Sequence, residues 1–359
     1  MKITSFLLIM LLTFSLCACV ASVTPPTQTG KTAADGNNEA AASPGGGESP
    51  GTYIVVTDQA GRTVHVKSPA EKIVSGYYIS TSVCIALGAA DRLAGIEAKA
   101  ASRPIYALAK PELLKLPDVG TAKNFNLEAC LALKPDLVIL PYSLRDKADI
   151  MGEMGVSVIL VNPESYTLLT EMINLIGKAT GTEERAGKLN TYLENTRAEL
   201  AGLTGGLTYR PGVYFGGVGS YLTTASKDMY QAALIEMAGG RNAAIGVEGG
   251  GWTQVSYEQL LAMNPEIMVI PSEASYNKED VVSDPQLADL AAVKDNWVYH
   301  MPSNFEAWDS PLPSGMLGAK WLLYVLHEDV YPLKTLRNDA AEFYREFYGI
   351  EIDAGLIGK

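Results

Sequence analysis

Two segments of the chain share one pattern of apolar and polar positions. Residues 126–141 read NLEACLALKPDLVILP and residues 256–271 read SYEQLLAMNPEIMVIP, and the two align without a gap. In each copy, apolar residues at helical spacing are followed by a proline and then by four consecutive apolar residues. A short continuous apolar run is typical of a strand buried on both faces of a parallel sheet. The chain therefore predicts the same helix–turn–strand unit twice.

The ends of these units also carry local signals. Asn126 and Ser256 are residue types that cap helix N-termini, and Gln259 three positions after Ser256 completes a capping-box pattern. Pro141 and Pro271 follow the apolar runs, so we expect both strands to end there. Open α/β sheets bind ligands outside the carboxyl ends of their strands, which points to the loops after these two prolines.

The same alternation of helix and strand continues around both copies. Apolar segments predict further strands at residues 72–75, 157–161 and 211–216, and a helix at 81–87. Between the halves, residues 165–203 are rich in helical patterns, and 182–203 predict one long amphipathic helix. We therefore predict an α/β fold with two Rossmann-like lobes joined by a long rigid α-helix, and a ligand cleft between the lobes. The predicted boundaries are 53–177 for the N-terminal lobe, 178–203 for the connecting helix and 204–359 for the C-terminal lobe with a C-terminal helix.

The first 52 residues differ from the rest. Residues 1–19 have the pattern of a signal peptide, with a basic start, an apolar run over 3–16 and the sequence LCAC at 16–19. LCAC resembles a bacterial lipobox with small Ala18 before Cys19, which predicts lipid on Cys19; an ordinary secretory signal cleaved nearby is the alternative. Residues 20–52 are almost all small or polar, which predicts a flexible tether. We expect an extracytoplasmic protein anchored to the cell membrane by lipid.

Composition limits the classes of function. The chain of 359 residues has 28 basic and 40 acidic side chains, a net charge of −12, and such a balance argues against nucleic-acid binding. Beyond the first 52 residues the only cysteines are Cys84 and Cys130, both in apolar helical patterns. Buried free thiols are the simpler interpretation, and a disulfide between them stays open.

Four further phrases give the sequence a family resemblance. They are VTDQAGRTVHVKSPAEKIVS, ALGAADRLAGI, LPDVGTAKNFNLEACLALKPDLVIL and WDSPLPSGMLGAKWLLYVLH, in this order along the chain. From Tyr53 to about Tyr348, the chain resembles the substrate-binding proteins of bacterial ATP-binding-cassette (ABC) importers, in the helical-backbone class that serves iron-siderophores, haem and cobalamin. The resemblance implies a non-enzymatic protein that delivers a small-molecule metal chelate to a permease dimer with separate ATPase subunits.

The loops after the predicted strands supply the candidate ligand-binding residues. Aromatic rings offer a large contact area at low entropic cost and suit bulky, partly apolar ligands, while Lys and Arg suit an anionic chelate. Asp309 is a candidate to bond the ligand or to cap the following helix. Core packing of the rings and solvation of the charges, including Lys147, are the alternatives. The candidates are Tyr77, Tyr78, Lys123, Tyr142, Arg145, Tyr221, Trp252, Trp308 and Asp309.

Glu128 and Glu258 occupy the same column of the repeat. Each falls at the second position of a predicted helix, where the helix dipole favours a carboxylate without any further role. In the family resembled here, glutamates at these two motif positions dock the lobes onto arginines of the permease. The resemblance thus implies that both lobes present one carboxylate to a two-fold symmetric partner.

Other functions fit the sequence less well. A site for a free first-row metal ion needs several converging ligands, and the chain has only three histidines, His65, His300 and His327. No nucleophile elbow, phosphate loop or dinucleotide fingerprint occurs, so hydrolysis through Glu273 or Asp309 has no support. An adhesion module would lack a deep cleft. We expect no intrinsic cofactor and no bound metal. The expected ligand is a ferric siderophore, and haem, cobalamin or an oxyanion such as molybdate or tungstate are the alternatives.

Overall fold

The computed structural model describes residues 52–359, which belong to one compact unit. The predictions for the signal peptide, for the lipidation of Cys19 and for all but the last residue of the tether lie outside the described residues. No helix within 52–359 combines the length and the apolar character that crossing a membrane requires.

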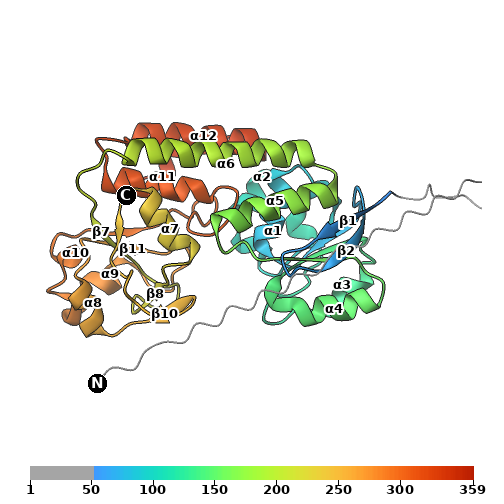
Figure 1. Cartoon of the computed structure of the whole chain (residues 1–359), viewed down its shortest axis with the longest axis horizontal. Coiled ribbons are helices and arrows are strands. Elements are labelled where there is room, and N and C mark those ends of the chain that lie inside the picture. The colour runs from blue at the N-terminus through green and yellow to red at the C-terminus, as the bar shows by residue number, and fades with distance from the viewer. Residues whose placement is uncertain (1–51) are drawn as a thin grey trace, which may run out of the picture. The chain divides into compact units, whose positions relative to one another are not determined.

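The first half of this unit alternates strands and helices, starting with a short antiparallel hairpin of β1 and β2 (Figure 1). Its elements are β1 (Tyr53–Thr57), β2 (Thr63–Lys67), β3 (Ile73–Ser75), α1 (Tyr78–Ala86), β4 (Leu93–Gly95), α2 (Pro104–Ala109), α3 (Leu127–Ala132), β5 (Leu137–Pro141), α4 (Arg145–Glu153), β6 (Val158–Val161), α5 (Tyr166–Thr180) and α6 (Glu183–Thr204).

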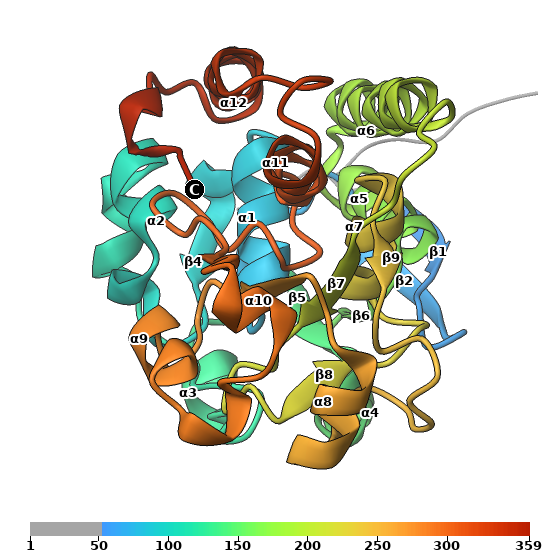
Figure 2. The ribbon, with the colours of Figure 1, turned by 90° about the vertical axis from the view of Figure 1, so that its left-hand side faces the viewer.

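The second half has the same alternation and ends in two helices. Figure 2 looks onto this half, with α8, α9 and α10 towards the viewer. Its elements are β7 (Gly212–Phe215), β8 (Thr223–Ala225), α7 (Tyr230–Met237), β9 (Arg241–Asn242), β10 (Trp252–Gln254), α8 (Tyr257–Met263), β11 (Ile267–Ile270), α9 (Lys278–Val282), α10 (Ala291–Lys294), β12 (Val298–His300), α11 (Gly315–Leu326) and α12 (Leu333–Tyr348).

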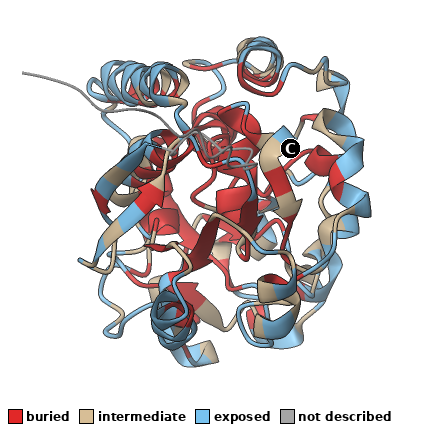
Figure 3. Ribbon diagram, turned by 90° about the vertical axis from the view of Figure 1, so that its right-hand side faces the viewer, coloured by how far each residue is buried: buried red, intermediate tan, exposed pale blue. Residues whose placement is uncertain are grey.

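Each half contains a separate four-stranded parallel sheet, and the two sheets have the same topology. The strand orders are β4-β3-β5-β6 and β9-β7-β11-β12. In each sheet, the strand that comes first along the chain lies second in the order, and the strand that comes third along the chain pairs with it. The strands of the sequence repeat, β5 and β11, occupy equivalent places and are buried along their whole length. Figure 3 shows that buried segments lie in the interior and exposed ones on the outer helices. The predicted fold class, two α/β lobes rather than one continuous sheet, is confirmed.

The predicted helix starts of the repeat are also confirmed. The side chain of Asn126 accepts a hydrogen bond from the backbone N–H of Ala129 at the start of α3. Ser256 and Gln259 form a complete capping box at the start of α8. These contacts satisfy N–H groups that have no partner inside the helix, and they fix where each repeat unit begins.

The connecting helix is α6, and it begins later than the predicted boundary at residue 178. Residue 178 lies in the last turn of α5, which ends at Gly181 in the left-handed conformation (φ 65°). Glycine adopts this conformation without strain, which makes it the usual helix terminator. After this break α6 runs for 22 residues, from Glu183 to Thr204, and packs on α5, α7 and α11.

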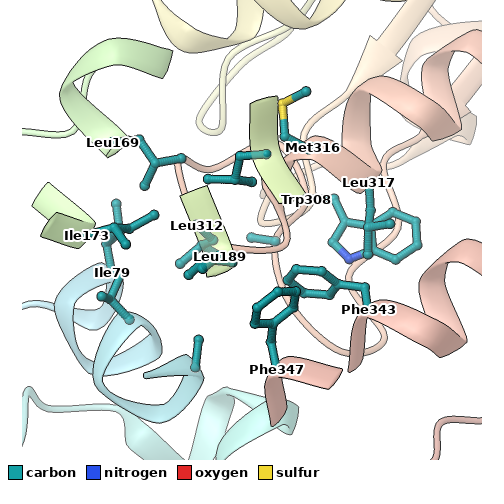
Figure 4. Packing of buried hydrophobic residues seen from close by; sticks show 14 of the residues in the cluster. Ile79, Leu169, Ile173, Leu189, Trp308, Leu312, Met316, Leu317, Phe343 and Phe347 are labelled. Carbon is teal, nitrogen blue, oxygen red and sulfur yellow. The ribbon is translucent and has the colours of Figure 1, made fainter. Parts of the chain in front are cut away.

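One hydrophobic core crosses from lobe to lobe. It includes Ile79 of α1, Leu189 of the connecting helix and Phe343 of α12, and Figure 4 shows these side chains in one cluster. The last helix, α12, packs on α11 and also on α1 of the first lobe. Because burial of apolar surface is the main stabilising term in folding, a core that is shared in this way opposes large movements of the lobes.

Candidate functional site

A cavity of about 290 Å³ lies where the two lobes face each other. The first lobe contributes α1 and the segment that leads into α2, and the second contributes the loop after β11 and the segment after β12. The lining residues are Tyr78, Ser82, Ser102, Arg103, Pro104, Ile105, Tyr106, Ser272, Glu273, Ser303, Phe305, Glu306, Ala307 and Leu312. The carboxyl ends of β11 and β12 thus lead into the cavity, as expected for ligand sites of open α/β sheets.

Arg103 is the basic residue of this cavity. Its guanidinium lies 3.9 Å from the centre of the Tyr78 ring, and its Nη1 donates to Oε1 of Glu273, 3.1 Å away on the other lobe. The Nε atom is buried and has no hydrogen-bond partner among the described residues. Glu97 lies further off, with Oε1 3.7 Å from this Nε. The cavity therefore offers a cation whose nearest counter-ion, Glu273, is itself largely exposed.

Hydroxyl groups surround this cation. Tyr78 Oη donates to Ser310 Oγ across the lobes at 3.1 Å, and Tyr106 Oη donates to Glu97 Oε1 at 2.6 Å. Burial raises the pKa of Tyr78 to about 12 and that of Tyr106 well above its ordinary value. Both phenols are therefore neutral at physiological pH and keep their O–H donors.

Glu306 forms the buried floor of the cavity. Its Oε1 accepts hydrogen bonds from Ser82 Oγ of α1 and from Tyr348 Oη of α12, so the carboxyl joins three distant parts of the chain. Its Oε2 is buried without a partner in the part of the chain that the structure describes. Desolvation by burial raises the pKa of Glu306, although the hydrogen bonds from Ser82 and Tyr348 oppose the shift. The environment thus favours the neutral carboxylic acid.

Glu306→Gln is expected to stabilise the protein at neutral and alkaline pH. A carboxyl whose pKa is raised on folding holds its proton more tightly in the native state than in the unfolded state. The free energy of unfolding therefore falls as the pH rises from the unfolded pKa, about 4.5, through the folded pKa. Glutamine is neutral at every pH and escapes this loss. We expect the melting temperature of the variant to exceed that of the native chain by about 2 °C or more at pH 8, and the gap to close below pH 4.5.

Thermal unfolding followed by circular dichroism across this pH range measures the effect. Glu171→Gln is the matched control, because Glu171 is exposed on α5. A substitution at an exposed position alters the free energy of unfolding little, so the difference between this control and the native chain should not change over the pH range in which Glu306 titrates. The difference in melting temperature between the Glu306→Gln variant and the native chain should be larger at pH 8 than at pH 5. A smaller difference at pH 8 would contradict the prediction.

The structure places one of the candidate ligand residues, Tyr78, in the cavity wall. Tyr77 is its neighbour in an edge-to-face pair, with the ring centres 5.3 Å apart, and it is partly buried against the core. Lys123, Tyr142 and Arg145 are exposed and lie outside the cavity lining, and Arg145 faces Asp149 on its own helix at 4.0 Å. The first lobe therefore supplies Arg103, rather than Lys123 or Arg145, as the cation of this cavity.

The candidates of the second lobe are spread more widely. Tyr221 donates through its hydroxyl to Asp284 at 2.8 Å and packs on Tyr276, away from the cavity lining. Trp252 lies on β10, which pairs with β8 in a two-stranded antiparallel sheet, and 40% of its surface is exposed. Neither residue contributes to the cavity wall described above.

Trp308 and Asp309 are part of the protein interior. Trp308 is 1% exposed, and its Nε1 donates to Tyr344 Oη at 2.9 Å. The Gly- and Pro-rich context of Trp308 does mark a loop, but α11 and α12 cover that loop, so the ring serves the core. Asp309 accepts hydrogen bonds from the backbone N–H and the hydroxyl of Ser272, which holds a cavity-lining loop in place. It does not cap the helix that follows.

Arg103, Ser82, Tyr106 and Glu306 were absent from the sequence-based candidates, although they line the cavity. Arg103 lies directly before Pro104 and not after a predicted strand, so the rule that ligand loops follow strands misses it. Glu306 stands in the same EAWDSP segment as Trp308, and only packing distinguishes the residue that faces the cavity from the one that faces the core.

The two glutamates of the repeat lie at equivalent places. Glu128 is the second residue of α3 and Glu258 is the second residue of α8, and both side chains are exposed. A hydrogen bond from the Ser256 hydroxyl holds the pKa of Glu258 below its ordinary value. The structure thus offers one exposed carboxylate per lobe at matching topological positions.

The two cysteines of the described chain are free and buried. Cys84 lies in α1 and Cys130 in α3, and burial raises the pKa of the Cys84 thiol to about 12. They form no disulfide with each other. Within residues 52–359, no group of three or more His, Cys, Asp or Glu side chains is placed to hold a metal ion.

The fold and the cavity define a class of protein: two α/β lobes, linked by a rigid helix, that bind a solute between them. Residues 73–305 match the family model described as periplasmic binding protein. The chain belongs to this family, in its helical-backbone type.

Similar proteins are known by sequence and by structure. The molybdate-binding protein MolA of Haemophilus influenzae is 24% identical, over 82% of this chain and 90% of its own length. The uncharacterized ABC transporter substrate-binding lipoprotein YvrC of Bacillus subtilis is 24% identical, over 72% of this chain and 81% of its own length. Among solved structures, a periplasmic solute binding protein from Veillonella parvula superimposes with a TM-score of 0.75, at 26% identity, and covers 85% of this chain and 95% of its own.

Proposed function

We propose that this protein is the extracytoplasmic solute-binding component of an ABC importer, and that its cleft captures a compact anionic chelate of iron, a ferric siderophore. Arg103 is the single observation that carries the choice of an anion, because its guanidinium lies in the cavity wall, stacks on Tyr78 and has a buried Nε with no hydrogen-bond partner within residues 52–359. Guanidinium groups bind carboxylate, catecholate and other oxyanions through several N–H donors at once.

The size and the lining of the cavity support a compact ligand. A volume of about 290 Å³ is at the low end for small-molecule sites. The wall combines aromatic rings, such as Tyr106 and Phe305, with the hydroxyls of several serines. Such a wall binds the organic rim of a chelate through its rings, and the hydroxyl of Ser303 offers an O–H donor to the oxygen atoms of the chelate.

Molybdate is the second candidate, and a specific observation favours it. MolA, a relative that spans most of this chain, is named for molybdate binding. A small oxyanion needs a cation and O–H donors, and the cavity lining supplies Arg103 as the cation and the hydroxyl of Ser303 as a donor. Haem and cobalamin remain alternatives that the same fold accommodates.

The proposed importer partners are a permease dimer and separate ATPase subunits. We propose that Glu128 and Glu258 dock the two lobes onto the permease, which is supported by their equivalent, exposed positions. Lipid on Cys19 would keep the protein near that permease, and the name of the relative YvrC as a lipoprotein supports such an anchor.

A panel of ligands tests the proposal. Residues 52–359 are mixed in turn with a ferric tricatecholate, a ferric trihydroxamate, sodium molybdate, haemin and cyanocobalamin, and thermal unfolding is recorded. A ligand that binds only the folded state raises the free energy of unfolding by about 2.7 kcal/mol at one hundred times its Kd, which shifts the melting temperature by several degrees. We expect a ferric chelate to give this shift. A shift with molybdate alone would select the second candidate, and no shift with any of the five would overturn the anionic-chelate proposal.

A further inference from the structure

A second hollow, of about 470 Å³, lies on the C-terminal lobe and is called here the basic hollow. It is bordered by the start of α9, the end of β12, one residue of α12 and the C-terminal segment, all of which belong to the half that Figure 2 faces. Its lining residues are Lys278, Val298, Tyr299, His300, Met301, Pro302, Ser303, Asn304, Arg337, Gly355, Leu356, Ile357, Gly358 and Lys359.

The charge of this hollow is unusual for the molecule. Lys278, His300, Arg337 and Lys359 line it, and no Asp or Glu side chain does so among the residues that the structure describes. The chain as a whole is acidic, with a net charge of −12, and the four other hollows described for residues 52–359 each include at least one glutamate. A concave site lined by one sign of charge concentrates ions of the opposite sign.

Two of the charged side chains of the hollow have no carboxylate partner. Neither Lys278 nor Arg337 forms an ion pair within the described part of the chain, whereas Lys359 pairs with Glu328 at 2.7 Å. Lys278 Nζ donates to the backbone oxygen of Asn296 at 3.0 Å, which leaves it further N–H donors. Both uncompensated side chains are only partly exposed, so an anion in the hollow would meet charges that water screens incompletely.

The surrounding groups hold Arg337 and His300 in place. Arg337 donates through Nε and Nη2 to the backbone oxygen of Ile357, at 3.0 and 2.8 Å, which fixes the guanidinium against the C-terminal segment. His300 Nδ1 donates to the oxygen of Met301 at 3.0 Å, and no described group bonds its Nε2. Donors that are fixed before binding lose little entropy when a ligand arrives.

We propose that the basic hollow is a second ligand site, which takes an organic phosphate. The cations Lys278 and Arg337 match the charge of a phosphate group, and the volume exceeds what the phosphate alone would fill. The exposed apolar side chain of Leu356 offers a surface for the organic part. A soluble phosphate ester and the headgroup of an anionic phospholipid present this same chemistry.

This site is separate from the cleft described above, and the proposal does not depend on the function proposed for that cleft. Ser303 lines both hollows, so the segment after β12 forms a wall that the two share. The test must therefore show that a phosphate probe binds on the basic side of this wall and not beside Arg103.

Calorimetric titration of residues 52–359 with glycerol 3-phosphate tests the proposal. We expect saturable binding to the native chain and affinity about tenfold lower or worse for Lys278→Gln, because a hydrogen bond to a charged group is lost. Lys334→Gln is the matched control, since Lys334 is an exposed lysine of α12 outside the hollow, and we expect no change for it. His300→Gln is a second variant for the hollow and should also weaken binding.

Two further arms assign the site and the source of the ligand. The Arg103→Met variant should bind glycerol 3-phosphate as the native chain does; loss of binding in this variant would place the probe in the cleft and overturn the proposal. Co-sedimentation is measured with phosphatidylcholine vesicles that contain or lack phosphatidylglycerol. If the native chain binds only the vesicles with phosphatidylglycerol, and Lys278→Gln abolishes this vesicle binding, the ligand is a lipid headgroup. Binding of glycerol 3-phosphate without vesicle binding identifies a soluble ester. No binding of either probe, or equal binding by native chain and Lys278→Gln, would refute the site.

Discussion

Replacing Arg103 by methionine is expected to lower the affinity for the anionic solute of the cleft by about a hundredfold or more. The guanidinium is the cation of the cavity wall, and its side chain is only 18% exposed. Truncating one partner of a largely buried charge pair costs about 2–5 kcal/mol, in large part because the other charge is left without a partner. Calorimetric titration with the ligand that the panel identifies measures the loss.

Two variants make this result specific. Arg145→Met removes the same charge from an exposed position of the same lobe, outside the cavity, and we expect no change in affinity. Glu273→Gln removes the carboxylate that pairs with Arg103, so it should tighten anion binding several-fold. Equal loss in the Arg103 and Arg145 variants would favour the wider set of basic residues predicted from the sequence. Weaker binding in the Glu273 variant would contradict the view that this carboxylate competes with the ligand.

Replacing Glu128 and Glu258 together by alanine is expected to abolish uptake of the solute by whole cells. One carboxylate from each lobe would be lost at the exposed start of α3 and of α8, and with it the charge pairing proposed for the permease. Truncating one side of a charge pair that becomes buried in a complex weakens the complex by about 2–5 kcal/mol per pair, which is enough to remove docking at physiological concentrations. The measurement is uptake of labelled solute into cells that lack the native chain.

The purified double variant should still bind its solute with native affinity, because both side chains are exposed and lie outside the cavity lining. Glu112→Ala with Glu279→Ala is the control, since it removes one exposed carboxylate per lobe at unrelated positions. Native uptake by the variant that lacks Glu128 and Glu258 would refute the docking role. Loss of solute binding in that variant would instead mean that the two glutamates act through the stability of the lobes.

Much of the fold could be predicted from local patterns. The repeat around Asn126 and Ser256 predicted two equivalent units, and the structure contains two sheets of identical topology with the repeat strands at matching places. These signals are reliable because capping, proline and apolar runs act within a few residues of one another. The long helix predicted over 182–203 agrees with α6, whereas the boundary at 178 falls inside α5, which ends at the left-handed Gly181.

The residues of the candidate site could be predicted only in part from local patterns. Tyr78 was predicted and lies in the cavity wall, while Trp308, with an equally suggestive context, is buried against α12. The order of residues along a loop does not reveal which side chain faces a cavity and which faces the core. Long-range packing decides this, and for Trp308 the deciding contact is with Tyr344, which lies in the last helix.

The sequence by itself determined the two-lobed α/β architecture, the helix between the lobes and the equivalent placement of Glu128 and Glu258, because helix caps, breakers and apolar periodicity are local properties of the chain. Only the tertiary structure decided that Arg103, stacked on Tyr78 and paired with Glu273, is the cation of the cavity. The physical reason is that these contacts join residues far apart in the chain, and their energy depends on burial and distance, which no local pattern encodes.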